Sequence, residues 1–111
     1  MSKALIEKLK RARETGVTVH GHTFTIRRPT DEDAQQMSGL HPVDFVKRFV
    51  VGWDLAESDF DPGGGPEKVP FDRDLWEAWI ADHAEYWDEL AMPMLDAYKA
   101  HVEARKEHAK N

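Results

Sequence analysis

The fold is set mainly by one segment, Val17-Thr-Val-His-Gly-His-Thr-Phe-Thr-Ile-Arg27, in which β-branched and aromatic residues alternate with polar ones. Strict alternation predicts β-strands, and the central Gly21 predicts the turn of a hairpin. Val17 and Val19 share one side of the first strand. Phe24 and Ile26 share one side of the second, so each strand has an apolar side. Because a lone two-stranded hairpin is marginal in water, we expect it to pack on helices.

The segment before the hairpin, residues 1–14, is predicted to contain an amphipathic helix from Ser2 to about Arg13. Apolar residues recur there at helical spacing between charged residues, and Gly16 follows: Leu5, Ile6, Leu9 and Ala12. The helix therefore has one apolar stripe to bury. The same charges interrupt the apolar positions, so the pattern is not that of a signal peptide.

Helical patterns dominate the rest of the chain. Thr30, Pro42 and Asp72 are residues that favour the first turn or the cap of a helix. The segment Asp59–Pro66 has too many glycines and prolines for a helix or an internal strand, so we expect a mobile loop. Four helices are expected. The first runs from Thr30 to about Met37, and the second runs from Pro42 to Gly52-Trp53 with an apolar face of Phe45, Val46, Phe49 and Val50. The third starts at Asp72 with an apolar face of Leu75, Trp76, Trp79 and Ile80, and the fourth runs from Ala84 to about Lys106 with a kink or break at Pro93.

These elements predict an α+β fold, mostly helical, with the N-terminal β-hairpin packed on a helical bundle. The 111 residues suit a single domain, residues 1–111, with a frayed end at 103–111. The core is expected to contain Phe45, Phe49, Leu75, Trp79 and Leu90.

Composition and charge restrict the classes of function that this chain can have. The chain is acidic, with net charge -6, lacks cysteine, and has no apolar run near the ~18 residues of a membrane span, so we expect a cytoplasmic protein that binds no membrane. Residues 1–28 hold seven Lys/Arg against two Glu, whereas residues 54–96 hold thirteen Asp/Glu against two basic residues. The acidic half opposes nucleic-acid binding. The basic segment either folds against the acidic part, is solvated, or supports head-to-tail self-association.

Catalytic and cofactor motifs are weak or broken in this sequence. His20 and His22 have no obvious third ligand nearby, and Gly21 is expected to separate them in the turn. A calcium loop starting at Asp59 fails because its twelfth position is Pro70 instead of a bidentate Glu. The glycines at 63–65 lack the Lys-Ser/Thr of a phosphate-binding loop. We therefore expect no enzyme, no metal and no cofactor.

Aromatic density is the feature that remains, and it indicates protein binding. Trp76 and Trp79 are the better core candidates, while one core cannot easily take every large side chain between positions 53 and 87. Tryptophan and tyrosine are enriched at interaction hot spots. The predicted partner-binding residues are Trp53, Phe71, Trp76, Tyr86, Trp87 and Met94.

The order of these motifs resembles the tail assembly chaperones of long-tailed bacteriophages and prophages. The resemblance rests on Phe24-Thr-Ile-Arg-Arg-Pro-Thr-Asp31 before a helix, Phe49-Val-Val-Gly-Trp53, an acidic loop, Pro70-Phe71-Asp72 and a Leu-Trp helix before a long one. It spans about residues 17–100. Many relatives continue Gly-Trp with a small residue and a Gly-Val pair, whereas this chain continues Asp54-Leu-Ala.

The resemblance implies a non-catalytic chaperone in the host cytoplasm that coats the tape-measure protein, helps recruit tail-tube subunits and is absent from the virion. It also implies a longer product made by ribosomal frameshifting, for which Ala109-Lys-Asn111 would have to be encoded by a slippery run of adenines. The alternative class is a head–tail connector or tail completion protein that stays in the virion.

Overall fold

The predicted β-hairpin is confirmed in the computed structural model, which describes residues 2–110. β1 (Glu14–Val19) pairs with β2 (His22–Arg27), and Val19 lies opposite His22. The two turn residues have positive φ, 49° at His20 and 83° at Gly21, as the tight turns of twisted hairpins require. Val17 lies opposite Phe24, so the apolar residues of both strands share one face of the sheet.

A third strand, β3 (Val50–Trp53), replaces the end of a predicted helix. The sequence pattern placed Val50 on the face of the helix that starts at Pro42, and this was wrong. That helix, α3 (Pro42–Phe49), ends before the predicted terminus at Gly52-Trp53, because Val-Val-Gly-Trp suits a strand and finds a partner in β2. β3 pairs antiparallel with β2, which gives the sheet order β1-β2-β3. The hairpin therefore forms part of a three-stranded sheet.

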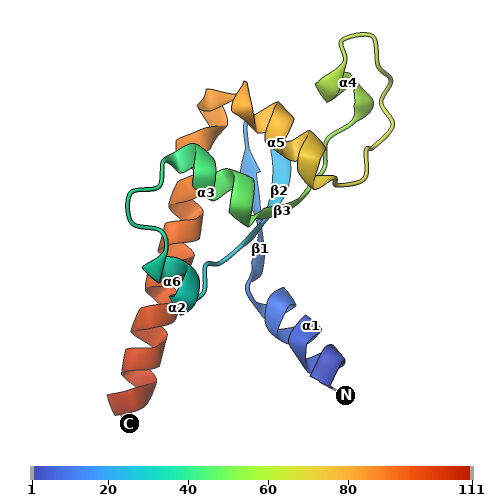
Figure 1. Cartoon of the computed structure of the whole chain (residues 1–111). Helices are drawn as coiled ribbons and strands as arrows, with labels where there is room; N and C mark the ends of the chain where they lie inside the picture. Colours follow the sequence, from blue (N-terminus) through green and yellow to red (C-terminus); the bar gives the residue numbers. More distant parts are fainter. Residues whose placement is uncertain (1, 111) are drawn as a thin grey trace.

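α3 and the long C-terminal helix pack against this sheet and against each other (Figure 1). α2 (Asp31–Gln35) begins at Thr30, whose hydroxyl accepts the N–H of Asp33. α5 (Arg73–Ala81) begins at Asp72, whose carboxylate accepts the N–H of Leu75. Both caps were predicted. The expectation of a helix-free loop after Asp59 was wrong at its start, because α4 (Glu57–Phe60) covers its first residues.

The last helix is preceded by a short 3-10 turn, η1 (Ala84–Tyr86), and then runs as α6 (Trp87–Lys110). Pro93 lies within α6 without splitting it. The helix also continues through residues 103–110, where the sequence predicted a frayed end. Met1 and Asn111 lie outside the described residues. Asn111 is the last residue of the tripeptide on which the frameshifting hypothesis rests, so that end of the tripeptide is not described.

One connected core lies between the sheet and the helices. Of the five predicted core residues, Phe49, Trp79 and Leu90 are buried, whereas Phe45 and Leu75 are only half-buried. The largest fully buried side chains are Trp76, Phe24, Ile26, Leu55, Ile80, Leu90 and Met94.

The molecule is elongated because two helices extend beyond this core. Its axes measure 57 × 36 × 22 Å and its radius of gyration is 15.7 Å, whereas a compact chain of this length has about 13 Å. α1 (Ser2–Ala12) and the C-terminal half of α6 project from the body as two arms (Figure 1). Within residues 2–110, none of the helices combines the length and apolar character needed to cross a bilayer.

Candidate protein-binding surface

All four tryptophans use their indole N–H groups inside the fold. Each group donates to a backbone carbonyl of another segment, so each ring is both packed and hydrogen-bonded. The pairs are Trp53 with Val69 (2.6 Å), Trp76 with Val46 (2.8 Å), Trp79 with Asp59 (3.0 Å) and Trp87 with Ile80 (2.7 Å). The tryptophans therefore connect the segments of the chain to one another.

Three of the predicted partner-binding residues are buried, which corrects the sequence-based prediction for them. Trp76 and Met94 are 0% exposed and Tyr86 is 7% exposed. The reason lies in the sheet: Phe24 projects between the helices, with its ring 5.6 Å from that of Trp76 and 5.7 Å from that of Tyr86. One core does accommodate these aromatic side chains, and a partner cannot reach them without opening the fold.

The other three predicted residues, Trp53, Phe71 and Trp87, are half-buried and pack against the core. The Trp53 ring lies 4.8 Å from that of Phe71 and 5.3 Å from that of Phe60. This cluster joins β3 to the segment that returns from α4 to α5. These three side chains are therefore only partly available to a partner.

The exposed apolar side chains lie elsewhere, mainly on α1. Leu5 and Leu9 are each 64% exposed and Ile6 is 48% exposed, and none of the residues Ser2–Ala12 is buried. The sequence predicted this apolar stripe correctly. The expectation that the fold buries the stripe was wrong, whereas the alternative of a solvated N-terminal segment agrees with its exposure. The sequence pattern contained the signal for this surface, since a helix with a strong apolar stripe needs a partner, inside or outside the chain.

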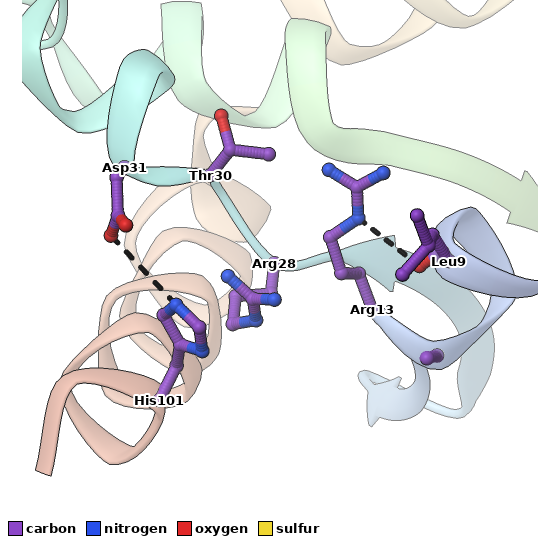
Figure 2. A pocket seen from close by; sticks show the side chains of 7 residues that line it. Leu9, Arg13, Arg28, Thr30, Asp31 and His101 are labelled. Atoms are coloured by element: carbon purple, nitrogen blue, oxygen red, sulfur yellow. Dashed lines mark hydrogen bonds and ion pairs between the residues drawn. The ribbon is translucent and has the colours of Figure 1, made fainter. Parts of the chain in front are cut away.

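A cleft lies between the two arms, and we call it the arm cleft (Figure 2). It has a volume of about 310 Å³ and lies where α1, the segment between β2 and α2, and α6 approach one another. Its lining residues are Leu9, Ala12, Arg13, Arg28, Thr30, Asp31 and His101. The apolar stripe of α1 thus continues into a cleft with basic walls.

Asp31 organises the charges at the α6 side of the arm cleft. Its carboxylate accepts hydrogen bonds from Arg105 and from the hydroxyl of Tyr98 (3.0 Å), and it lies 3.8 Å from His101 Nε2. The hydrogen bond from Arg105, followed by that from Tyr98, lowers the pKa of Asp31 below its ordinary value. The same contact raises the pKa of Arg105. These contacts hold α2 against the projecting half of α6.

A second hollow, which we call the acidic groove, lies between β1 and the first half of α6. Its volume is about 460 Å³. The floor is apolar, and Met92 within it is 53% exposed. The lining residues are Val17, Thr18, Val19, Asp88, Glu89, Met92, Pro93 and Asp96. An apolar floor with carboxylates around it suits a cationic, apolar segment.

The two histidines of the hairpin contact different parts of the chain. His20, in the turn, lies edge-on to the Tyr86 ring at 4.9 Å and 3.4 Å from a carboxylate oxygen of Glu89. His22 lies between Asp54 and Asp59, with each imidazole nitrogen 3.3 Å from one carboxylate oxygen. In the part of the chain that the structure describes, no group of three or more histidine or carboxylate side chains is arranged to hold a metal ion.

Comparison with known proteins adds no relative. A scan against protein-family models and searches of curated proteins and of solved structures found no match to this chain. The fold and the surface therefore define an α+β domain with an exposed apolar helix. Any assignment of function rests on the residues of this chain.

Proposed function

We propose that this chain is a non-catalytic phage tail assembly chaperone, which binds and solubilises the tape-measure protein in the host cytoplasm and helps recruit tail-tube subunits. The observation that carries the proposal is the apolar face of α1, where Leu5, Ile6 and Leu9 remain exposed. Large apolar side chains gathered on one exposed face mark an interaction surface.

The proposed client is a helix with an apolar stripe. A tape-measure helix would lie against Leu5, Ile6 and Leu9 and along the arm cleft, in the helix-in-groove mode of recognition. The net charge of -6 would keep the complex dispersed. Because the buried tryptophans hold the core together, the binding surface is assigned to α1 instead of the aromatic helices.

The sequence resemblance supports the proposal through residues that meet in space. Val51-Gly52-Trp53 lies in β3, and Pro70-Phe71-Asp72 leads into α5. The rings of Trp53 and Phe71 are 4.8 Å apart, and Trp53 also donates a hydrogen bond to the backbone of Val69. The two most specific pieces of the resemblance therefore form one structural unit, which closes the loop between them.

The test is co-expression with a tape-measure protein from the same genome. The wild-type chain should raise the soluble fraction of that protein several-fold, whereas Leu5→Ser/Leu9→Ser should remove most of the gain. Both leucines are exposed, so their replacement should change the free energy of unfolding by no more than ~0.5 kcal/mol. Asp74→Ser/Glu77→Ser is the control, since both residues are exposed on α5 and lie outside both the arm cleft and the acidic groove.

Two results would overturn the proposal. One is an equally insoluble tape-measure protein with and without this chain. The other is the presence of this chain at stoichiometric copy number in purified particles, measured by mass spectrometry, which would identify a connector or completion protein retained in the virion.

A further inference from the structure

We propose that the chain self-associates head to tail, with the apolar face of α1 of one copy seated in the acidic groove of the next. This inference does not depend on the identity of any client. It follows from two surfaces of the same chain that match in length and in charge.

The first surface is α1, which is cationic as well as apolar. Between Ser2 and Ala12 it carries Lys3, Lys8, Lys10 and Arg11 against Glu7 alone. Lys8 and Arg11 are three residues apart, so both lie along one flank of the stripe that contains Leu5 and Leu9. A partner for this face must offer apolar surface together with negative charge.

The second surface, the acidic groove, offers both. Asp88, Glu89 and Asp96 surround its apolar floor, and residues 84–96 contain four acidic residues and neither Lys nor Arg. Leu5 to Ala12 extends about 10 Å along the axis of α1, and Asp88 to Asp96 about 12 Å along α6, at 1.5 Å per residue. The apolar length of α1 therefore fits the groove.

The fold keeps α1 away from the groove of its own chain. α1 leads directly into β1, and the backbone of Arg13 bonds both to Lys10 and to Arg28 at this junction. α1 faces the C-terminal half of α6, because Leu9 and His101 line the same arm cleft, whereas the acidic groove lies beside the N-terminal half of α6. The groove must therefore receive α1 from a second copy. Because the two contact surfaces differ, the contact is head-to-tail and continues into a ring or an open chain.

Sedimentation velocity on the full chain tests the inference. The weight-average mass should rise at least about two-fold between ~5 and ~500 μM protein, the range in which a contact of modest size assembles. Raising the salt from about 50 to about 500 mM should weaken the association several-fold, because the contact pairs opposite charges. A monomer at every concentration would overturn the inference, whether α1 is solvated or folds back on its own chain.

Charge reversal makes the test specific for the two surfaces. Lys8→Glu/Arg11→Glu gives an acidic helix that faces an acidic groove, and Asp88→Lys/Asp96→Lys gives a basic helix that faces a basic groove. Each variant alone should stay monomeric. An equimolar mixture should regain the wild-type mass, because every contact in the mixture then joins opposite charges. A mixture that remains monomeric would contradict the proposed contact.

Two controls complete the design. Asp74→Lys/Glu77→Lys reverses two exposed carboxylates on α5, outside the groove, and should associate like the wild type. Circular dichroism should show that every variant keeps the wild-type helix content.

Flotation with phosphatidylglycerol vesicles tests the alternative that the cationic amphipathic helix α1 binds a lipid surface. Vesicle binding by a chain that is monomeric at every concentration would assign α1 to a lipid surface and overturn self-association.

Discussion

Trp76 donates its indole N–H to the carbonyl oxygen of Val46 at 2.8 Å, and both side chains are fully buried. The same carbonyl accepts the N–H of Val50, where α3 ends and β3 begins. The bond therefore joins α5 to the point at which the chain changes from helix to strand. Trp76 was predicted both as a core residue and as a partner-binding residue; its burial confirms the first prediction and makes it a central contact of the fold.

Trp76→Phe should lower the free energy of unfolding by roughly 2–4 kcal/mol, because it removes a buried hydrogen bond and leaves a cavity. Urea unfolding followed by fluorescence or circular dichroism measures this change. Trp87→Phe removes a similar bond from a half-buried ring and should cost less. Equal losses in the two variants would contradict the central place given to Trp76.

Gly64→Ala should destabilise the loop between α4 and α5. A Cβ at Gly64 would lie 2.8 Å from the backbone carbonyl carbon and oxygen of Glu57 and 3.0 Å from the carbonyl oxygen of Asp61, so the backbone would have to move. We expect a loss of about 1–3 kcal/mol in the free energy of unfolding. Gly65→Ala is the matched control, since a Cβ there meets nothing within 4 Å and stability should stay equal or rise slightly. The claim of close packing at Gly64 fails if both variants behave alike.

Asp31 should make stability depend on pH. Arg105 and then Tyr98 lower its folded pKa, so its contribution is fully present above its unfolded pKa of about 4 and is lost as the pH falls through the lower folded pKa. The difference in unfolding free energy between the wild type and Asp31→Asn should thus be largest near neutral pH and shrink under acid. Urea unfolding between about pH 7 and pH 3 measures it. In an Arg105→Ala background the difference should be smaller at every pH; an unchanged difference would show that Arg105 does not stabilise the carboxylate.

Client binding and self-association should compete, because both would use Leu5, Ile6 and Leu9. Adding a soluble tape-measure fragment that carries the bound helix should reduce the sedimenting oligomers in proportion to the fragment added. Oligomers that persist with bound fragment would separate the two surfaces and place the client outside α1.

Much of the fold could be predicted from local patterns. The alternation around Gly21 predicted the hairpin, Thr30 and Asp72 predicted two helix starts, and the spacing of Trp76, Trp79 and Ile80 predicted the buried face of α5. Each of these signals acts over a few residues, where backbone propensity and capping hydrogen bonds dominate. The end of α3 was less predictable, because Val50 suits a helix face or a strand until β2 supplies its hydrogen-bond partner.

The proposed binding surface was the least predictable part. The sequence contained both the aromatic cluster and the amphipathic helix of α1, yet the solvent exposure of each depends on residues distant in the chain. Trp76 and Tyr86 are buried because Phe24 of the sheet lies between them and completes the core.

The sequence by itself determined which segments become strands or helices and which side of each is apolar, since those properties follow from residues a few positions apart. Only the tertiary structure decided which apolar sides are covered. The core closed over the faces of α3, α5 and the first half of α6, and the apolar face of α1 stayed exposed. Burial depends on the contacts that distant segments make, and the described chain supplies no segment to cover Leu5, Ile6 and Leu9.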